Sequence, residues 1–554
     1  MPSRALTIAS RLLAVAVAAT PGPCPADVTL EAVPPSLRWT DAVEPGALRL
    51  ACAPGEPELA ALFEREGLPF RADLLRREPG KVCHLFFRPT VPGFRASPDD
   101  DPLTGILFDA DPLLYLAATS RNRGEPLGAM REVLGRIHRP LDVGVLIHRV
   151  HAASVYDRAT RLSFAGTPHR IRLLERGAER NFWWVQDYVK PGVSGRGPTL
   201  LVPRRIFEGD PGNADAFEPL LAELCRQGRA VRSQLSWEGG DLQLTRDPRD
   251  ARRLVLYYGT FAKPYWAETL TPGEFAYALS LELGADRAVD LGGLAPHVDY
   301  FTLFLPRARA ALVSVPVAGD FDVARAAVDA LRAEFGDRAP AVLADLRRSL
   351  SAPGPDPRRV RELVERAREE QGQWAFRTDS GLAERTKALV ARACPDGRDC
   401  FSASSQLRMV EADPAAFEDW VHAVQRAREE QAITTAHLDL VESQLDPVPD
   451  ELRRRTEEKA AELEAIGFRV IRVPAFRVDL RVRRTWPGVS YVNGLVVDEQ
   501  VFLPRFGLGD VEERIFRDIG SQLPWGYSVV PIDAQRVLVR NGGLHCLAGL
   551  VRSP

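Results

Sequence analysis

The hydrophobic positions of the chain follow two different spacings. Compact apolar runs predict β-strands, and longer stretches with apolar residues three or four positions apart predict helices. Strands are expected at residues 143–150, 199–202, 254–258 and 312–315, and helices at residues 126–137 and 214–226. Strands and helices that mix in this way from residue 103 onward favour an α/β fold rather than an all-β fold.

The spacing changes between residues 321 and 466, where helical patterns dominate. Amphipathic or charge-rich helices are expected at residues 323–335, 357–371, 381–393, 415–431 and 450–466. Many of their opposite charges stand four positions apart, which supports exposed helices. We therefore expect a helical insertion at about residues 321–466, with strands resuming at residues 468–473.

The N-terminus has the pattern of a secretory signal. Arg4 and Arg11 precede the apolar run 12–19, and small residues follow it. The run is too short for a membrane span but suits the apolar region of a signal peptide. Residues 1–24 are therefore expected to be a signal peptide of a secreted or periplasmic protein. The alternative is a disordered tail in a cytoplasmic protein.

Composition adds the scale and the domain plan. The chain has 554 residues, of which 45% are hydrophobic, so a large core and more than one domain are expected. Residues 25–102 favour short strands with one helix near 56–65, and the polar stretch 97–102 separates this accessory region from a main domain at 103–554. The net charge of −3 provides no basic field for nucleic acid.

The last fourteen residues, NGGLHCLAGLVRSP, place two glycines, a histidine and a cysteine together. Residues 536–540 alternate as a strand does, and Gly542 and Gly543 permit a tight turn. Cys546 is therefore expected just after a strand end, where a bound group can reach it. A buried structural thiol is the alternative.

The other six cysteines are an even number, which fits an oxidising compartment. Two of them, Cys394 and Cys400, enclose a turn-rich loop that a disulfide could close.

Four further motifs precede this cysteine: WWVQD at 183–187, WEGGD at 237–241, HVD at 297–299 and SYVN at 490–493. In this order, and ending in His-Cys, they resemble the guanidine-modifying superfamily of deiminases and amidinotransferases. The W-x-Q-D, H-V-D, V-N and H-C segments are similar to the peptidylarginine deiminases, whereas Glu-Gly-Gly-Asp is similar to the arginine and agmatine deiminases. The resemblance covers about residues 140–554 and implies a catalytic domain that is a five-bladed α/β propeller.

The residue types in these motifs suit chemistry on a guanidinium group, which is planar, cationic and weakly electrophilic. Cys546 is predicted to be the nucleophile and His297 the proton shuttle. Asp187 and Asp299 are predicted to grip the guanidinium through paired hydrogen bonds. His297 and Asp299 are two apart in a strand-like context, residues 296–305, so both should point the same way. A metal pair or a surface strand is the alternative, but the chain has no HExxH or CxxC pattern.

The predicted substrate-binding residues are Trp184, Glu238, Asn493, Arg204 and Arg205. Trp184 would form a cation–π wall, and Glu238 would contact the guanidinium or support His297. The resemblance implies that Asn493 orients the site. The two arginines are expected to meet a substrate carbonyl, although such a pair on a loop is usually only solvated. Asp241 is expected to be structural, and His545 structural or a support for the reacting groups.

Together these expectations predict hydrolysis of an arginine guanidinium, in peptides or proteins, to citrulline and ammonia through a cysteine thiouronium. The alternatives are a deiminase of agmatine or free arginine, an amidinotransferase, and an inactive binding module on this scaffold. A papain-like protease is disfavoured because its cysteine precedes its histidine. No cofactor is expected. Calcium assists the animal peptidylarginine deiminases, but Tyr188 and Lys190 occupy positions where acids would be expected, so no calcium requirement is predicted.

Overall fold

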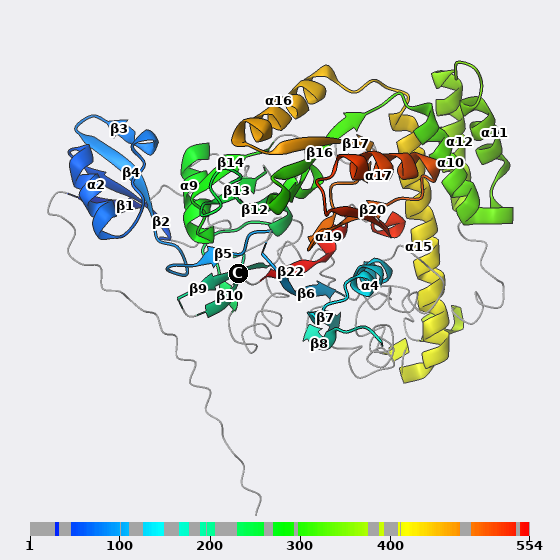
Figure 1. Cartoon of the computed structure of the whole chain (residues 1–554). Coiled ribbons are helices and arrows are strands. Elements are labelled where there is room, and N and C mark those ends of the chain that lie inside the picture. Colours follow the sequence, from blue (N-terminus) through cyan, green and yellow to red (C-terminus); the bar gives the residue numbers. More distant parts are fainter. Residues whose placement is uncertain are drawn as a thin grey trace, which may run out of the picture. The chain divides into compact units, whose positions relative to one another are not determined.

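The fold is that of a computed structural model of the chain. It describes residues 28–32, 46–99, 101–109, 126–148, 166–176, 189–195, 197–204, 230–259, 270–292, 297–374, 387–392, 408–409, 411–476, 489–538 and 543–552. The chain divides into two compact units, Met1–Pro34 with Pro45–Arg88 and Pro35–Glu44 with Pro89–Pro554. Figure 1 labels most of the longer elements of both units.

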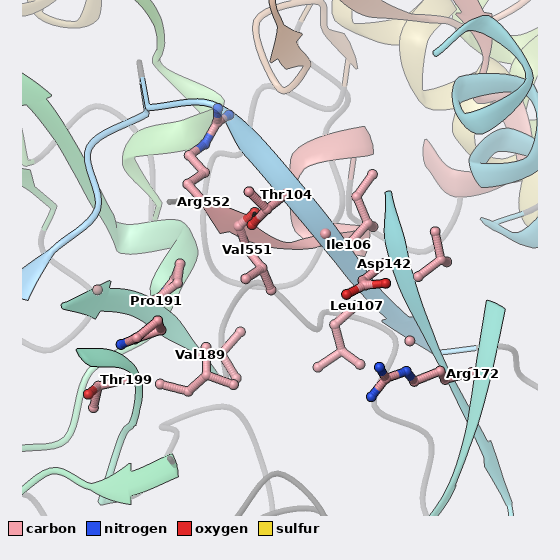
Figure 2. Close-up of a pocket in the computed structure, with 16 residues that line it drawn as sticks. Thr104, Ile106, Leu107, Asp142, Arg172, Val189, Pro191, Thr199, Val551 and Arg552 are labelled. Carbon is pink, nitrogen blue, oxygen red and sulfur yellow. Dashed lines mark hydrogen bonds between the residues drawn. The ribbon is translucent and has the colours of Figure 1, made fainter. Parts of the chain in front are cut away.

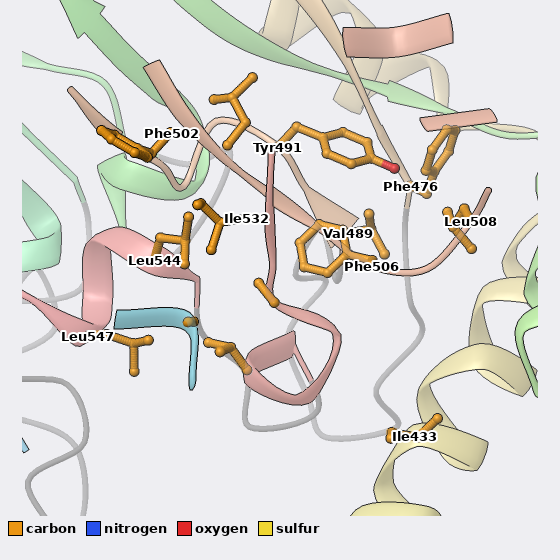
Figure 3. Close-up of a cluster of buried hydrophobic side chains, with 14 of the residues drawn as sticks. Ile433, Phe476, Val489, Tyr491, Phe502, Phe506, Leu508, Ile532, Leu544 and Leu547 are labelled. Carbon is orange, nitrogen blue, oxygen red and sulfur yellow. The ribbon is translucent and has the colours of Figure 1, made fainter. Parts of the chain in front are cut away.

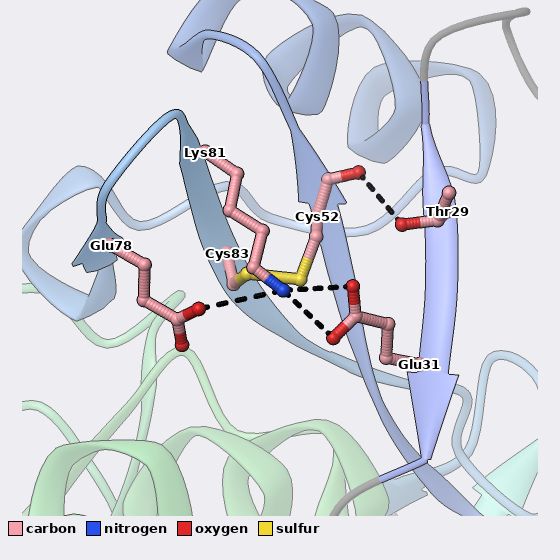
Figure 4. Close-up of a disulfide and its surroundings, with 6 residues drawn as sticks. All are labelled: Thr29, Glu31, Cys52, Glu78, Lys81 and Cys83. Carbon is pink, nitrogen blue, oxygen red and sulfur yellow. Dashed lines mark hydrogen bonds and ion pairs between the residues drawn. A yellow bond between two sulfur atoms is a disulfide. The ribbon is translucent and has the colours of Figure 1, made fainter.

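The first unit is an antiparallel sheet with one helix. Its strands, in the order β1-β2-β4-β3, are β1 (Thr29–Ala32), β2 (Leu48–Ala53), β4 (Lys81–Phe87) and β3 (Arg76–Glu78). Helix α2 (Glu56–Arg65) packs against β2 and β4. Cys52 and Cys83 lie directly opposite each other on β2 and β4 and form a disulfide (Figure 4). The short strands and the helix expected in this region are confirmed.

The boundary predicted at residue 102 is wrong, because the first unit ends at Arg88. Strand β5 (Arg95–Ala96) pairs with β9 (Lys190–Ser194) of the second unit. Thr90 donates from its amide (2.8 Å) and its hydroxyl (2.5 Å) to the buried carboxylate of Glu282. These contacts attach the residues that follow Arg88 to the second unit.

Within its described residues, the second unit has five small mixed sheets. Their strand orders are β11-β10-β9-β5, β12-β13-β14, β15-β16-β17-β18, β19-β20-β21 and β22-β6-β7-β8. In each sheet one strand pairs antiparallel on one side and parallel on the other, as β13 does between β12 and β14. The predicted α/β class is confirmed.

The remaining strands are β6 (Leu103–Asp109), β7 (Asp142–His148), β8 (Arg170–Arg176), β10 (Gly197–Val202), β11 (Ala230–Arg232), β12 (Leu242–Arg246), β13 (Leu254–Tyr258), β14 (Arg287–Asp290), β15 (Thr302–Leu305), β16 (Ala310–Val317), β17 (Arg469–Phe476), β18 (Val489–Ser490), β19 (Leu495–Val497), β20 (Gln500–Arg505), β21 (Ser528–Asp533) and β22 (Gly549–Arg552). The strands expected at 143–150, 199–202, 254–258 and 312–315 are therefore present, as β7, β10, β13 and part of β16. The helix expected at 126–137 is α4 (Pro126–Arg136). The helix expected at 214–226 lies outside the described residues.

The helical block separates two neighbouring strands of one sheet. Strands β16 and β17 pair in parallel, yet five long helices lie between them in the described part of the sequence. They are α10 (Phe321–Phe335), α11 (Ala341–Leu350), α12 (Pro357–Trp374), α15 (Pro414–Ser443) and α16 (Asp450–Ile466). Helix α10 packs against α11 and α15, so the block has its own helix contacts. The expected helical segment is confirmed, apart from residues 381–386 and 393, which lie outside the described residues.

The C-terminal segment is held firmly. Strand β22 pairs antiparallel with β6, and the guanidinium of Arg552 donates to the carbonyls of Asp101 (2.8 Å) and Val496 (3.1 Å). Such contacts prevent the fraying that is usual at a chain end. No helix in the described parts of the chain is long and apolar enough to cross a membrane.

Candidate active site

Cys546 lies in a short helix, not after a strand. Helix α19 (Leu544–Leu547) carries it, and the segment expected as a strand at 536–540 begins as helix α18 (Gln535–Leu538). The carboxylate of Asp533 accepts from the amide of Gln535 (3.3 Å), which starts a helical turn that the alternating pattern did not predict. The expectation that Cys546 follows a strand end is therefore wrong.

Apolar neighbours hold helix α19 in place. Leu544 and Leu547 are buried in a cluster that includes Phe502 and Ile532, and α19 packs against α4 and β20. Figure 3 shows these side chains around the two leucines. With both leucines packed in this core, the position of Cys546 between them is fixed by the helix.

Asn493 contacts this helix at three points. Its side-chain Nδ2 lies 3.2 Å from Cys546 Sγ, its Oδ1 accepts from the His545 amide (3.0 Å), and its carbonyl accepts from the Leu544 amide (3.0 Å). A Cβ at Gly543 would lie 2.4 Å from Asn493 Oδ1, so only glycine permits this approach. Asn493 therefore orients the Cys546 helix.

Asp299 also lies next to the thiol. Its Oδ2 is 2.9 Å from His545 Nδ1 and 3.5 Å from Cys546 Sγ. The side chain is only 1% exposed, and its Oδ1 has no hydrogen-bond partner among the described residues. A buried carboxylate oxygen without a donor is costly, so this oxygen is suited to receive the N–H group of a bound molecule.

His297 and Glu238 form a second buried pair, with Nε2 and Oε2 2.7 Å apart. Glu238 immediately precedes the 3-10 turn η3 (Gly239–Asp241), and His297 precedes the 3-10 turn η4 (Val298–Tyr300). The two turns pack against each other. Glu238 was expected either to contact the guanidinium or to support His297. Its contact with the His297 ring agrees with the second role.

The prediction of a strand at 296–305 is wrong for the first half of that range. Turn η4 occupies the place of a strand, and β15 begins only at Thr302. The amide of Phe301 donates to the Val298 carbonyl (2.9 Å), which closes the turn. His297 and Asp299 therefore reach different partners, Glu238 for the first and His545 with Cys546 for the second.

Two serines connect turn η4 to the Asn493 segment. The hydroxyls of Ser314 (3.0 Å) and Ser490 (2.8 Å) both donate to the carbonyl of Tyr300, and all three residues are buried. Because Asp299 lies in this turn and Asn493 follows Ser490 by three residues, the serines hold together the two segments that contact Cys546.

The Asn493 segment is also anchored by Glu512. Tyr491 donates to the Glu512 carboxylate (3.2 Å), which accepts the amides of Phe506 (2.6 Å) and Leu508 (2.9 Å) as well. Burial raises the pKa of Glu512 to about 7, although the amide donors act in the opposite direction. This carboxyl is therefore a structural group whose charge changes near neutral pH.

Several predicted residues lie outside the described residues. These are Asp187, Trp184 and Arg205, and also Cys394 and Cys400 of the expected disulfide. Arg204 is described and lies just after β10, where its amide donates to the carbonyl of Leu235 (3.0 Å). The site residues that are brought together are Cys546, Asn493 and Asp299, with His297 and Glu238 as a pair.

His545 makes a contact of the supporting kind expected for it. Its ring is buried, and its Nδ1 lies 2.9 Å from Asp299 Oδ2, the oxygen that also lies 3.5 Å from Cys546 Sγ. The adjacent side chains of helix α19 therefore meet at one carboxylate oxygen. The buried Cys546 thiol is not part of a disulfide, and the described residues contain no group of three or more metal-ligating side chains.

A separate pocket of about 490 Å³ lies between strands of two sheets. Figure 2 shows its lining from β6, β7, β8, β9, β10 and β22, with Asp142, Arg172 and Arg552 as charged members. Arg170 donates to Asp142 at 2.5 and 2.6 Å, so that carboxylate is already paired. None of the predicted catalytic residues lines this pocket.

The family comparison concerns the segment that carries Asn493, His545 and Cys546. Residues 422–549 match the Porphyromonas-type peptidyl-arginine deiminase family. The match confirms the resemblance predicted from the motifs and, with it, the enzyme class, a hydrolase of guanidino carbon–nitrogen bonds. It begins inside α15, so the last part of the helical block lies within the matched region.

Comparison with solved structures gives deiminases at low similarity. The agmatine deiminase of C. jejuni has 12% identity and a TM-score of 0.45, over 83% of this chain and 96% of that one. The agmatine deiminase of Enterococcus faecalis has 11% identity and a TM-score of 0.42, over 83% and 96%. Likeness at this level supports no conclusion about substrate. No curated protein sequence matches the chain.

Proposed function

We propose that the protein hydrolyses the guanidinium of arginine to a ureido group and ammonia, with Cys546 as the nucleophile. The observation that carries this proposal is the buried Asp299 carboxylate beside the Cys546 thiol. Its oxygen Oδ1 has no hydrogen-bond donor among the described residues. A guanidinium presents several N–H donors in one plane, so one of them can pair with Oδ1 while its carbon lies near the sulfur.

The reaction has two stages. The Cys546 thiolate attacks the central guanidinium carbon to form a tetrahedral adduct, and a proton from His297 lets ammonia leave. The carbon–sulfur bond remains in a thiouronium intermediate. Water, deprotonated by His297, then adds to the same carbon and expels the thiolate, which leaves the ureido product.

His297 is suited to this shuttle by its partner. Glu238 occupies Nε2, so transfer to and from the reacting atoms would use Nδ1. The carboxylate also stabilises the imidazolium that forms when the ring takes a proton from water. Asp187 is proposed as the second carboxylate on the guanidinium, on the strength of its motif.

Arginine within a peptide or protein is the proposed substrate. The W-x-Q-D and H-C motifs and the family match over residues 422–549 support it. Agmatine or free arginine is the second candidate, favoured by the Glu-Gly-Gly-Asp motif and by the contact of its Glu238 with His297. An amidinotransferase would use the same first stage and differ in the acceptor.

The five small sheets support a five-bladed propeller as the finer description of the second unit, because each repeats the same strand pairing. The Cys52–Cys83 disulfide supports a secreted or periplasmic location, since such bonds persist in oxidising compartments.

The surroundings of Lys190 support the prediction that calcium is not required. Lys190 stands where an acid would be expected, and its buried ammonium donates to two backbone carbonyls, those of Gly239 and Leu242. Calcium prefers carboxylate and carbonyl oxygens, so an ammonium beside them removes ligands and adds repulsion. We therefore propose activity without added calcium.

The test is a colorimetric ureido assay on a blocked arginine peptide, agmatine and free arginine, run with wild type and Cys546→Ala. The proposal expects turnover by wild type, none by the variant, and the highest kcat/KM for the peptide. A higher kcat/KM for agmatine or free arginine selects the second candidate. Absence of turnover on all three would overturn the proposed function.

A further inference from the structure

Lys190 is a cation in the protein interior. Its side chain is at the start of β9 and is 5% exposed, and its Nζ donates to the carbonyls of Gly239 (2.9 Å) and Leu242 (2.8 Å). Removing an ammonium from water costs several kcal/mol unless hydrogen bonds and charges offset it. A neutral apolar side chain would be easier to bury, so the position of this charge requires an explanation.

The two carbonyls belong to one short turn. Gly239 begins turn η3 and Leu242 directly follows it, and the Leu242 amide donates to the Gly239 carbonyl within the turn. The ammonium therefore bridges the first carbonyl of the turn and the one just beyond its end. Two charge-assisted bonds at these points fix the backbone of the turn more firmly than its own 3-10 bonds, which have poor geometry.

The residue at the entrance of this turn is Glu238. Its carbonyl accepts from the Asp241 amide (3.1 Å), so its backbone is part of the same hydrogen-bonded unit. Its carboxylate lies 2.7 Å from His297 Nε2. A shift of the turn would therefore move the carboxylate relative to the imidazole, and both groups are too buried for water to replace the contact readily.

We propose that Lys190 is a positioning residue, which holds the Glu238 turn so that its carboxylate stays on His297. This inference rests on the proposed function, in which His297 transfers the protons. The bonds of its ammonium to the Gly239 and Leu242 carbonyls are the contacts on which this role rests. Its effect passes through the backbone of η3 to Glu238, and from Glu238 to the imidazole.

Lys190→Met tests this by keeping the length of the side chain and removing its charge and donors. We expect kcat to fall by about 10- to 100-fold, as small misplacements of catalytic groups do, with KM changed by less than about threefold. Glu238→Gln should shift one limb of the plot of kcat against pH. Lys190→Met should shift the same limb in the same direction. Lys190→Arg, which keeps the charge and the donors, should recover part of kcat.

The double variant Lys190→Met, Glu238→Gln is the decisive comparison. If Lys190 acts through Glu238, the double variant loses little more kcat than Glu238→Gln alone. Independent, multiplicative losses would overturn the proposal. The matched control is Lys459→Met, because Lys459 also donates to a backbone carbonyl, that of Asp290 (2.9 Å), but from helix α16, which carries none of the proposed site residues. Its kcat should equal that of wild type.

Hydrogen exchange separates this inference from the proposed function. Wild-type protein without turnover on any guanidine would defeat the proposed function alone. In that case the amides of residues 239–242 still test the inference, because they should exchange faster in Lys190→Met than in wild type. Unchanged exchange in a folded variant would contradict it. If Lys190→Met does not fold, the same comparison is made with Lys190→Arg, in which a larger, branched head group should disturb these amides and those of no other turn.

Discussion

Asp299→Asn isolates the charge of the carboxylate that is proposed to receive the guanidinium. Asparagine has nearly the same shape, and its amide oxygen can take the place of Oδ2, which faces His545 Nδ1 at 2.9 Å and Cys546 Sγ at 3.5 Å. The amide nitrogen then takes the place of Oδ1, the oxygen without a described donor. A guanidinium N–H arriving there would meet another N–H group.

The expected cost follows from that mismatch. Leaving a buried charge without its partner costs about 2–5 kcal/mol, which corresponds to a fall in kcat/KM of roughly 30- to 5,000-fold. Folding should respond differently, because the substitution removes a buried carboxylate oxygen that has no described donor. The free energy of unfolding should therefore stay within about 1 kcal/mol of wild type or rise.

The assay pairs the ureido reaction with urea denaturation of the same samples. Asp101→Asn is the matched control, since Asp101 is also buried but accepts from Arg246 (2.5 Å) and has no contact with Cys546 described. It should lose about 1 kcal/mol of stability and keep kcat/KM. The reasoning is refuted if folded Asp299→Asn keeps kcat/KM within about threefold of wild type, since no interaction of the size above would then be present.

Three further predictions concern pH, the disulfide and calcium. Burial raises the pKa of Glu512 from its ordinary value of 4.5 to about 7 in the folded protein. The folded protein therefore holds this proton more tightly than the unfolded chain, and the free energy of unfolding should fall by up to about 3 kcal/mol as pH rises from 4.5 to 7. Glu512→Gln should flatten this decline, and the same pH dependence in wild type and variant, measured by urea unfolding, would contradict it. The double variant Cys52→Ala, Cys83→Ala opens a loop of 31 residues and should destabilise the first unit by about 3–4 kcal/mol. Hydrogen exchange of residues 46–88 measures this loss, and unchanged protection of these amides would contradict the prediction. After dialysis against EGTA the wild type should keep its rate, whereas a large rise on calcium titration from near zero would show that calcium is required.

The sequence predicted element types well where one pattern persisted over many residues. The helices at 323–335 and 450–466 and the strand at 254–258 are all present, because amphipathic spacing and continuous apolar runs reflect burial directly. The helical block was also recognised, although its position between the paired strands β16 and β17 is a long-range feature.

Short segments near the site were predicted less well, for a physical reason. Turn η4 and helix α18 are only three and four residues long, and carbonyl and carboxylate contacts decide them more than side-chain periodicity does. The Tyr300 carbonyl, for example, is held by serines 14 and 190 positions away. The pairing of His545 with Asp299 likewise depends on the folded chain, not on a local pattern.

The order of the motifs nevertheless predicted the main contacts of the site. Asp299, Asn493 and Cys546 are separated by up to 247 positions and meet around one sulfur atom. Their residue types suggested a thiol with a carboxylate and an amide nearby. The distances, and the roles of Lys190 and Gly543 in fixing them, required the structure.

The most direct test of the central claim is to locate the covalent bond. Wild-type protein is treated with a haloacetamidine, which mimics a guanidinium and alkylates a nearby thiol, and the labelled residue is identified by mass spectrometry with and without excess arginine peptide. The account predicts a label on Cys546 that appears as activity is lost, and slower labelling when the arginine peptide is present. Cys546→Ala should carry no label and should have no turnover. Turnover by Cys546→Ala, or inactivation with the label on another residue, would contradict it.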